Sequence, residues 1–239
     1  MTVNSLSGIL EKYRESDTTD GTADSSVKPS NTVGNIIIYK SSTASPAETD
    51  FTETVARVEK SVVEINTETV IYQKYYGNYI QSGAGSGVII GSDEAKDVYY
   101  VITNHHVVDS ANTITVRLYD GSEYNASLVA EDEISDIALV SISVSSGTEL
   151  SVAAYGDSSE LRNGQDIFAI GNPLGQLGGS VIKGIISKTE RHISVSGIRR
   201  SLLQIDASVN PGNSGGGLFD MAGNLVGIVN AKSSGDNVD

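Results

Sequence analysis

The sequence predicts an all-β protein built from two β-barrels, and three observations favour this fold class. Of the 239 residues, 38% are hydrophobic and 25 are Gly, and frequent Val, Ile, Ser and Thr favour short strands and turns over long helices. The apolar residues recur in short runs, either with a period of two or without a break, as in half-buried and fully buried strands. Around residues 143–159 a polar stretch separates two sets of such runs, as expected for a connection between two barrels.

The segment before the first predicted strand is polar. Residues 1–50 are rich in Ser, Thr, Asp and Ala and contain one short apolar run, at 36–39. Because so little apolar surface cannot offset the entropy lost on ordering, we expect a flexible polar arm over residues 1–50. In the stretch 50–60, apolar residues recur at helical spacing and Asp50 stands where it can cap a helix. This pattern predicts a short helix that leads into the first barrel.

The predicted strands define two domains. The N-terminal β-barrel is expected within residues 51–145 and the C-terminal β-barrel within residues 146–239. The runs expected to form strands in the first barrel are Val63–Ile65, Val88–Ile90, Tyr99–Ile102, Ile114–Leu118 and Ile137–Val140. Those expected in the second barrel are 166–170, 181–187, 202–205 and 225–229.

Charge and composition exclude several classes of function. The 30 acidic and 16 basic residues give a formal net charge of −14, which repels polyanions, so nucleic acid is not expected as a partner. The absence of Cys excludes disulfides, thiolate metal ligands and a cysteine nucleophile. No apolar run approaches the roughly 18 residues of a membrane span, and Met1 is not followed by a signal-peptide pattern.

One Gly-rich segment has the properties that a serine nucleophile needs. Ser214 lies within Gly212–Gly216, which reads Gly-Asn-Ser-Gly-Gly. Glycines permit positive φ and close approach of a substrate, so the N–H groups of Gly212 and Ser214 can converge on one oxyanion. By itself this segment fits an ordinary Gly-rich turn equally well.

A catalytic serine also needs a base and a carboxylate, and the sequence offers candidates for both. His105 and His106 end an apolar run, whereas His192 lies in a polar segment and is expected to be a solvated loop residue. Asp136 directly precedes another apolar run. The resulting order along the chain, His then Asp then Ser, is the order of the chymotrypsin-type fold.

Five segments together resemble one family, the HtrA/Deg serine proteases. The segments are Ser82–Ile90, Thr103–Val108, Ser135–Leu139, Ala169–Gly175 and Gly212–Gly216. The resemblance covers about residues 54–235. In the family pattern the catalytic His directly precedes Val, so the base falls on His106 and His105 occupies the variable position.

The resemblance implies a chymotrypsin/trypsin-like double β-barrel with a catalytic triad of His106, Asp136 and Ser214 in the cleft between the barrels. It implies a serine endopeptidase that cleaves unfolded or damaged proteins through an acyl-enzyme and needs no metal or other cofactor. The implied oxyanion hole comprises Gly212, Asn213 and Ser214. The implied substrate pocket comprises Val209, Asn230 and Lys232.

The resemblance also implies partners and a location. Family members often form homo-oligomers, commonly trimers, act outside the cytoplasm, and continue into one or more PDZ domains. The sequence ends at Asp239, before the last strand of the family pattern, so we expect the second barrel to be incomplete at the C-terminus. Two alternatives fit parts of the pattern: a catalytically weak, chaperone-like module that binds unfolded polypeptides, and a structural β protein in which Ser, His and Asp never meet.

Overall fold

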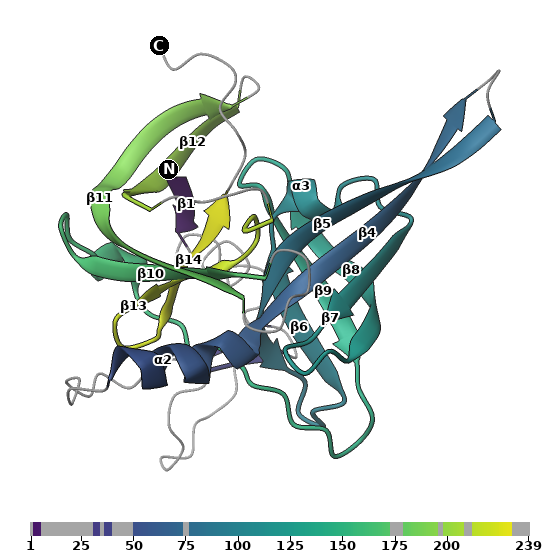
Figure 1. The fold of residues 1–239 in the computed structure, drawn as a ribbon, viewed down its shortest axis with the longest axis horizontal. Coiled ribbons are helices and arrows are strands. Elements are labelled where there is room, and N and C mark those ends of the chain that lie inside the picture. Colours follow the sequence, from purple (N-terminus) through teal and green to yellow (C-terminus); the bar gives the residue numbers. More distant parts are fainter. Residues whose placement is uncertain are drawn as a thin grey trace, which may run out of the picture.

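The computed structural model describes residues 2–5, 31–33, 36–39, 50–73, 77–172, 179–195, 198–207 and 212–230. The described chain consists mainly of antiparallel β-strands in two groups that lie side by side (Figure 1). The predicted all-β class and the double-barrel arrangement are confirmed.

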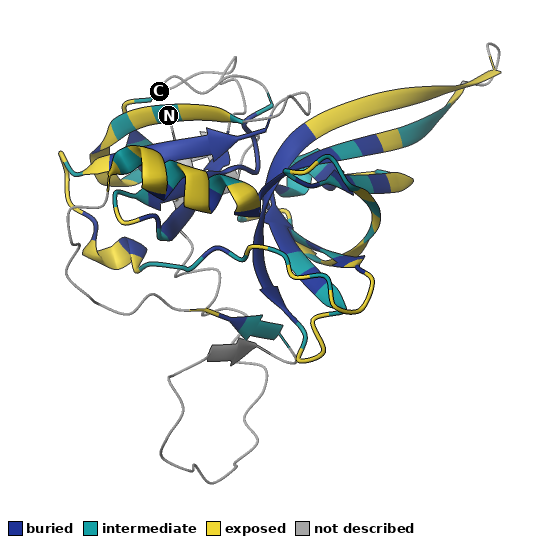
Figure 2. Ribbon diagram, turned by 60° about the horizontal axis from the view of Figure 1, so that its bottom comes forward, coloured by how far each residue is buried: buried dark blue, intermediate teal, exposed yellow. Residues whose placement is uncertain are grey.

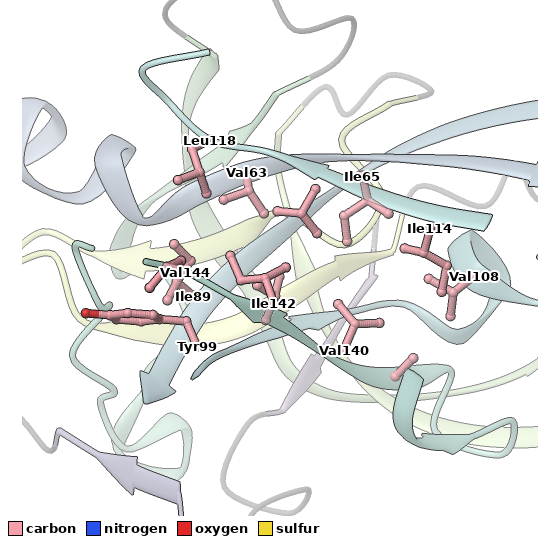
Figure 3. Packing of buried hydrophobic residues seen from close by; sticks show 13 residues of the cluster. Val63, Ile65, Ile89, Tyr99, Val108, Ile114, Leu118, Val140, Ile142 and Val144 are labelled. Carbon is pink, nitrogen blue, oxygen red and sulfur yellow. The ribbon is translucent and has the colours of Figure 1, made fainter. Parts of the chain in front are cut away.

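Six strands of the first group close into a barrel. They are β4 (Val62–Gln73), β5 (Gly77–Ser92), β6 (Val98–Thr103), β7 (Thr113–Arg117), β8 (Glu123–Asp132) and β9 (Ile137–Ser143). Pairing runs in the order β5-β4-β7-β8-β9-β6, and β5 also pairs with β6, so the circuit is complete. Alternate residues of these strands fill the interior, mostly with Val and Ile side chains and with Tyr99 at one side of the cluster (Figure 3), which is the packing that a small barrel requires.

The second group also forms a closed barrel of six strands. Five come from the C-terminal part of the chain: β10 (Asp166–Gly171), β11 (Ser180–Val195), β12 (Ile198–Ile205), β13 (Gly217–Asp220) and β14 (Leu225–Asn230). The sixth is β1 (Thr2–Ser5), and the order is β1-β12-β11-β10-β13-β14.

Strand β1 differs from two expectations drawn from the sequence. The second barrel was expected to be incomplete, but β1 pairs antiparallel with both β12 and β14 and closes it. The expected arm over residues 1–50 also contributes β2 (Asn31–Val33) and β3 (Ile36–Ile38), which pair with each other, and β3 pairs with β5. The physical reason is that unpaired backbone N–H and C=O groups at a sheet edge can hydrogen-bond to another strand whatever the polarity of its side chains.

Another cluster of buried side chains joins the two barrels. Val62 and Val88 of the first barrel pack with Phe168 and Phe219 of the second. Helix α2 (Phe51–Val58) covers this cluster, and its Phe51 ring meets the Phe168 ring edge-on at 5.2 Å between centroids. The short helix predicted near residue 50 is confirmed, with the Asp50 side chain accepting a hydrogen bond from the Thr52 N–H.

Strands β4 and β5 form a long hairpin that projects from the first barrel (Figures 1 and 2). The outer half of β5, residues 77–84, is exposed, whereas the inner half, residues 85–92, is buried. The buried half runs between the barrels and reaches the segment that carries Ser214. Three short helical turns complete the described structure: η1 (Glu59–Ser61), α3 (His105–Val108) and η2 (Ser158–Glu160).

Candidate active site

His106 is held at the end of a buried strand of the first barrel. Strand β6 ends at Thr103, and the chain turns directly into α3, whose second residue is His106. The ring lies between two of the predicted site residues. Its Nδ1 is 2.8 Å from Asp136 Oδ2, and its Nε2 is 3.1 Å from Ser214 Oγ. One imidazole therefore connects a carboxylate of the first barrel to a hydroxyl of the second.

Asp136 occupies a tight turn between β8 and β9 and is only 2% exposed. Its backbone is in the left-handed region, with φ of 57°, which Asp tolerates better than most residues but which still carries some strain. The His106 N–H donates to Oδ1 at 3.0 Å and the Asn230 amide donates to Oδ2 at 2.7 Å. The Asn104 amide donates to the Asp136 carbonyl at 2.9 Å. These donors fix both the carboxylate and the backbone that carries it.

Arg200 of β12 crosses from the second barrel to the turn that carries Asp136. Its Nε donates to the Ile134 carbonyl at 2.7 Å and its Nη2 donates to the Glu133 carbonyl at 2.8 Å. Its Nη1 lies 3.8 Å from Asp136 Oδ2 and has no hydrogen-bond partner among the described residues. The guanidinium thus hydrogen-bonds to the backbone of the turn and places a positive charge beside the Asp136 carboxylate.

These surroundings determine the protonation of the site. Burial raises the pKa of Asp136, but the hydrogen bonds from His106 and the electrostatic attraction of His106 and Arg200 outweigh it and lower the pKa. An ionised carboxylate only accepts hydrogen bonds, so His106 Nδ1 must carry its proton. The lone pair of Nε2 then faces the Ser214 hydroxyl. This is the arrangement in which an imidazole can remove a proton from a serine.

Ser214 lies in a turn that is held through its backbone carbonyls. The Gly212 carbonyl accepts a hydrogen bond from Ser86 Oγ at 2.7 Å, and the Asn213 carbonyl accepts one from the Gly216 N–H at 2.9 Å. The Ser214 carbonyl accepts one from the Ser86 N–H at 2.8 Å. Gly215 has φ of 84°, and a Cβ there would collide with the Ser86 carbonyl oxygen. Glycine is therefore required at this position for the turn to approach the first barrel so closely.

Comparison with known proteins agrees with this geometry. Residues 85–228 match the family model described as the trypsin-like peptidase domain. The chain belongs to the trypsin-like peptidase family. The matched residues include the predicted base, carboxylate and nucleophile of this peptidase domain.

Curated relatives of this trypsin-like peptidase carry HtrA-type names, which confirms the resemblance seen in the motifs. The serine protease Do-like HtrA of Bacillus subtilis (strain 168) is 44% identical over 164 residues, covering 66% of this chain and 36% of the relative. A probable periplasmic serine protease do/HhoA-like of Haemophilus influenzae is 48% identical over 158 residues, covering 65% of this chain and 32% of the relative. The chain thus spans about a third of the length of the curated relatives it matches.

Solved structures of an HtrA-type protease resemble the peptidase over about three quarters of its length. The HtrA-type protease AlgW with a tripeptide matches at 36% identity and a TM-score of 0.61, covering 75% of this chain and 54% of that chain. The same protease with a decapeptide matches at 32% identity and a TM-score of 0.60, covering 77% of this chain and 61% of that chain.

Of the other predicted site residues of this peptidase, three lie within the described part of the chain and two lie outside it. Asn230, expected in the substrate pocket, is buried and directs its amide at Asp136. Gly212 and Asn213, expected in the oxyanion hole, lie in the turn described above. Val209 and Lys232, also expected in the pocket, lie outside the described residues.

The two remaining histidines lie apart from the hydrogen bonds that join Asp136, His106 and Ser214. His105 Nε2 is 3.5 Å from Glu131 Oε2. The His192 side chain is 60% exposed and its Nε2 is 3.7 Å from Glu190 Oε1. The predicted exposure to solvent is confirmed, but the predicted loop is wrong, because His192 lies in β11 and pairs with Ser201 of β12. Within the described part of the chain, no group of three or more His, Asp or Glu could hold a metal ion. The described helices include none long and apolar enough to cross a membrane.

Three residues that contact the site were not singled out from the sequence: Ser86, Asn104 and Arg200. Arg200 lies on the same face of β12 as the buried Leu202, so the strand turns a charged residue inward, where it needs polar partners. The sequence of β12 does not alternate clearly, because Leu202 and Leu203 are adjacent, and it gave no sign of this burial. Ser86 and Asn104 lie within the segments Ser82–Ile90 and Thr103–Val108 that carry the family resemblance, but nothing in the sequence gave them a role, because small polar residues are common in strands and turns.

Proposed function

We propose that the protein is a serine endopeptidase in which Ser214 is the nucleophile, His106 the general base and Asp136 the carboxylate that orients the base. The observation that carries this proposal is the continuous set of hydrogen bonds from Asp136 through His106 to Ser214. Its parts come from both barrels, so the site depends on how the barrels pack.

The proposed mechanism follows from the protonation state of the site. His106 Nε2 takes the Ser214 proton as Oγ attacks a peptide carbonyl, and the ionised Asp136 stabilises the imidazolium that forms. The N–H groups of Gly212 and Ser214 stabilise the negative charge on the carbonyl oxygen. His106 then returns the proton to the leaving amine, and water hydrolyses the acyl-enzyme by the same route.

The substrates that we propose are unfolded or damaged polypeptides, in a role in protein quality control and stress response. Two of the related structures hold a tripeptide or a decapeptide according to their names, which supports polypeptide binding. We propose an extracytoplasmic location, because relatives are described as periplasmic proteases. By the same resemblance we propose a trimeric assembly and a PDZ region in the full-length protein. We also propose that the two barrels divide at about residue 145.

The test is cleavage of casein, which is largely unstructured, beside a tightly folded protein of similar size. The wild-type chain should cleave casein and spare the folded protein. Ser214→Ala should lose about 10⁶-fold in turnover, whereas Ser92→Ala, a matched change of a buried serine in β5, should cleave like the wild type. Equal cleavage by the wild type and Ser214→Ala would overturn the proposal. Binding of casein without cleavage by the wild type would favour the chaperone-like alternative instead.

A further inference from the structure

Ser86 links the first barrel to the turn that carries the proposed nucleophile. It lies in the buried half of β5 and is 0% exposed. Its N–H donates to the Ser214 carbonyl at 2.8 Å, and its carbonyl accepts from Thr103 Oγ1 at 2.7 Å. The backbone of Ser86 is therefore tied at once to the nucleophile and to the strand that leads to His106.

The Ser86 hydroxyl makes two further hydrogen bonds on the second barrel. It donates to the Gly212 carbonyl at 2.7 Å and accepts from the Asn172 N–H at 2.8 Å. A hydroxyl has one proton to donate, and here that proton is committed to Gly212. Because the hydroxyl is fully buried, water has no access to replace it.

The peptide unit between Gly212 and Asn213 is the one whose orientation this contact decides. Glycine has more backbone freedom than any other residue, and Gly212 has φ of 102°. Its N–H is one of the two proposed oxyanion donors. The Asn213 carbonyl, which shares a peptide plane with the other donor, the Ser214 N–H, is held within the turn by Gly216. The Gly212 carbonyl is held by a side chain of the opposite barrel.

The geometry points to Ser86 as a positioning residue of the oxyanion hole. Its hydroxyl fixes the Gly212 carbonyl and with it the plane of the Gly212–Asn213 peptide. That peptide lies between the two peptide units that carry the Gly212 and Ser214 N–H groups, so a side chain of the first barrel limits where both donors of the second barrel can point. This role rests on the proposed function. It is separate from the roles of His106 and Asp136, because the hydrogen bonds of Ser86 among the described residues go to the turn, to Thr103 and to Asn172.

The test compares the rate of inactivation by diisopropyl fluorophosphate, whose phosphoryl oxygen occupies the oxyanion hole, among variants of the full chain. Ser86→Ala should react about 10- to 100-fold more slowly than the wild type, somewhat less than the loss expected when a donor itself is removed. For a peptide substrate kcat should fall and KM should change little, since the hole acts mainly in the transition state. The midpoint of the pH profile should not move, because the base and its carboxylate are intact.

Controls separate this role from a general loss of structure. Ser92→Ala removes a buried hydroxyl from the same strand and should react at the wild-type rate. Should Ser86→Ala fail to fold, Ser86→Cys keeps a side chain of similar shape with a weak donor and should show a smaller loss in the same direction. Thermal unfolding of each variant identifies the folded ones.

The possible failures are distinguishable. Labelling of Ser214→Ala, or absence of labelling in the folded wild type, would overturn the proposed function and this role with it. Labelling of the wild type at Ser214 together with an unchanged rate in folded Ser86→Ala would overturn the positioning role alone. A shift of the pH profile in Ser86→Ala would also overturn it, since that would show an effect through the base.

Discussion

The two sides of the site are held in different ways. On the carboxylate side, Asp136 is surrounded by side-chain donors and charges from both barrels, including Asn230 and Arg200 of the second. On the nucleophile side, the Ser214 turn is held mainly through its own carbonyls, and the Ser86 side chain of the first barrel hydrogen-bonds to one of them. The difference indicates that substitutions on the carboxylate side change the electrostatics of the base, whereas substitutions around the turn change the geometry of the turn that carries Ser214.

The largest effect on the carboxylate side is expected from Asp136→Asn. An amide in place of the carboxylate would donate to His106 Nδ1 and favour the wrong tautomer, so kcat should fall by about 10⁴-fold. The measurement is steady-state hydrolysis of a peptide substrate, with the exposed Asp109→Asn as the matched control. A loss of less than about tenfold would contradict the role given to Asp136.

A smaller loss is expected from Asn230→Ala. The Asn230 amide donates to the carboxylate at 2.7 Å, and a hydrogen bond to a charged group contributes about 1.5–3 kcal/mol. If that contribution serves the transition state, kcat should fall about 10- to 100-fold and the pH profile of the base should shift. An altered KM with kcat unchanged would instead favour the substrate-pocket role expected from the sequence.

Arg200→Met is expected to act first on stability. Removing the guanidinium leaves the Glu133 and Ile134 carbonyls without their buried donor, so the free energy of unfolding should fall by about 3 kcal/mol. Denaturant unfolding measures this loss, and the exposed Arg162→Met serves as control. The folded fraction of Arg200→Met should also show a shifted pH profile, because the positive charge beside Asp136 is gone. A profile identical to that of the wild type would limit Arg200 to a structural role.

The smallest effect is expected in acid. The pKa of Asp136 lies below its ordinary value of 3.8, so its ionisation adds stability that is fully present above about pH 3.8. That stability is lost as the pH falls through the folded-state pKa. The difference in unfolding free energy between the wild type and Asp136→Asn should therefore shrink below about pH 3.8. A difference that stays constant down to pH 2 would contradict the direction of the pKa shift.

The sequence predicted the parts of the molecule that local pattern determines. The period of the apolar residues indicated the strands of both barrels, and the motifs around His106, Asp136 and Ser214 identified side chains that the structure brings within hydrogen-bonding distance. Each of these residues stands at the end of an apolar run or in a Gly-rich turn, so its signal is contained in a few neighbouring positions.

The sequence did not predict contacts that depend on long-range pairing. Arg200 reaches Glu133 across 67 positions, and Ser86 reaches Gly212 across 126. Neither segment carries a sign of its partner. Strand β1 was missed for a related reason, because its place beside β12 and β14 depends on backbone hydrogen bonds at two sheet edges rather than on its own apolar content.

The central claim is that His106, Asp136 and Ser214 work as one unit across the two barrels, and the most direct test is to locate the covalent adduct. The full chain is treated with a fluorophosphonate, digested and analysed by mass spectrometry, beside His106→Ala. The account predicts a single adduct, on Ser214, in the wild type and its near absence in His106→Ala. An adduct on another serine, or equal labelling of Ser214 without His106, would contradict it.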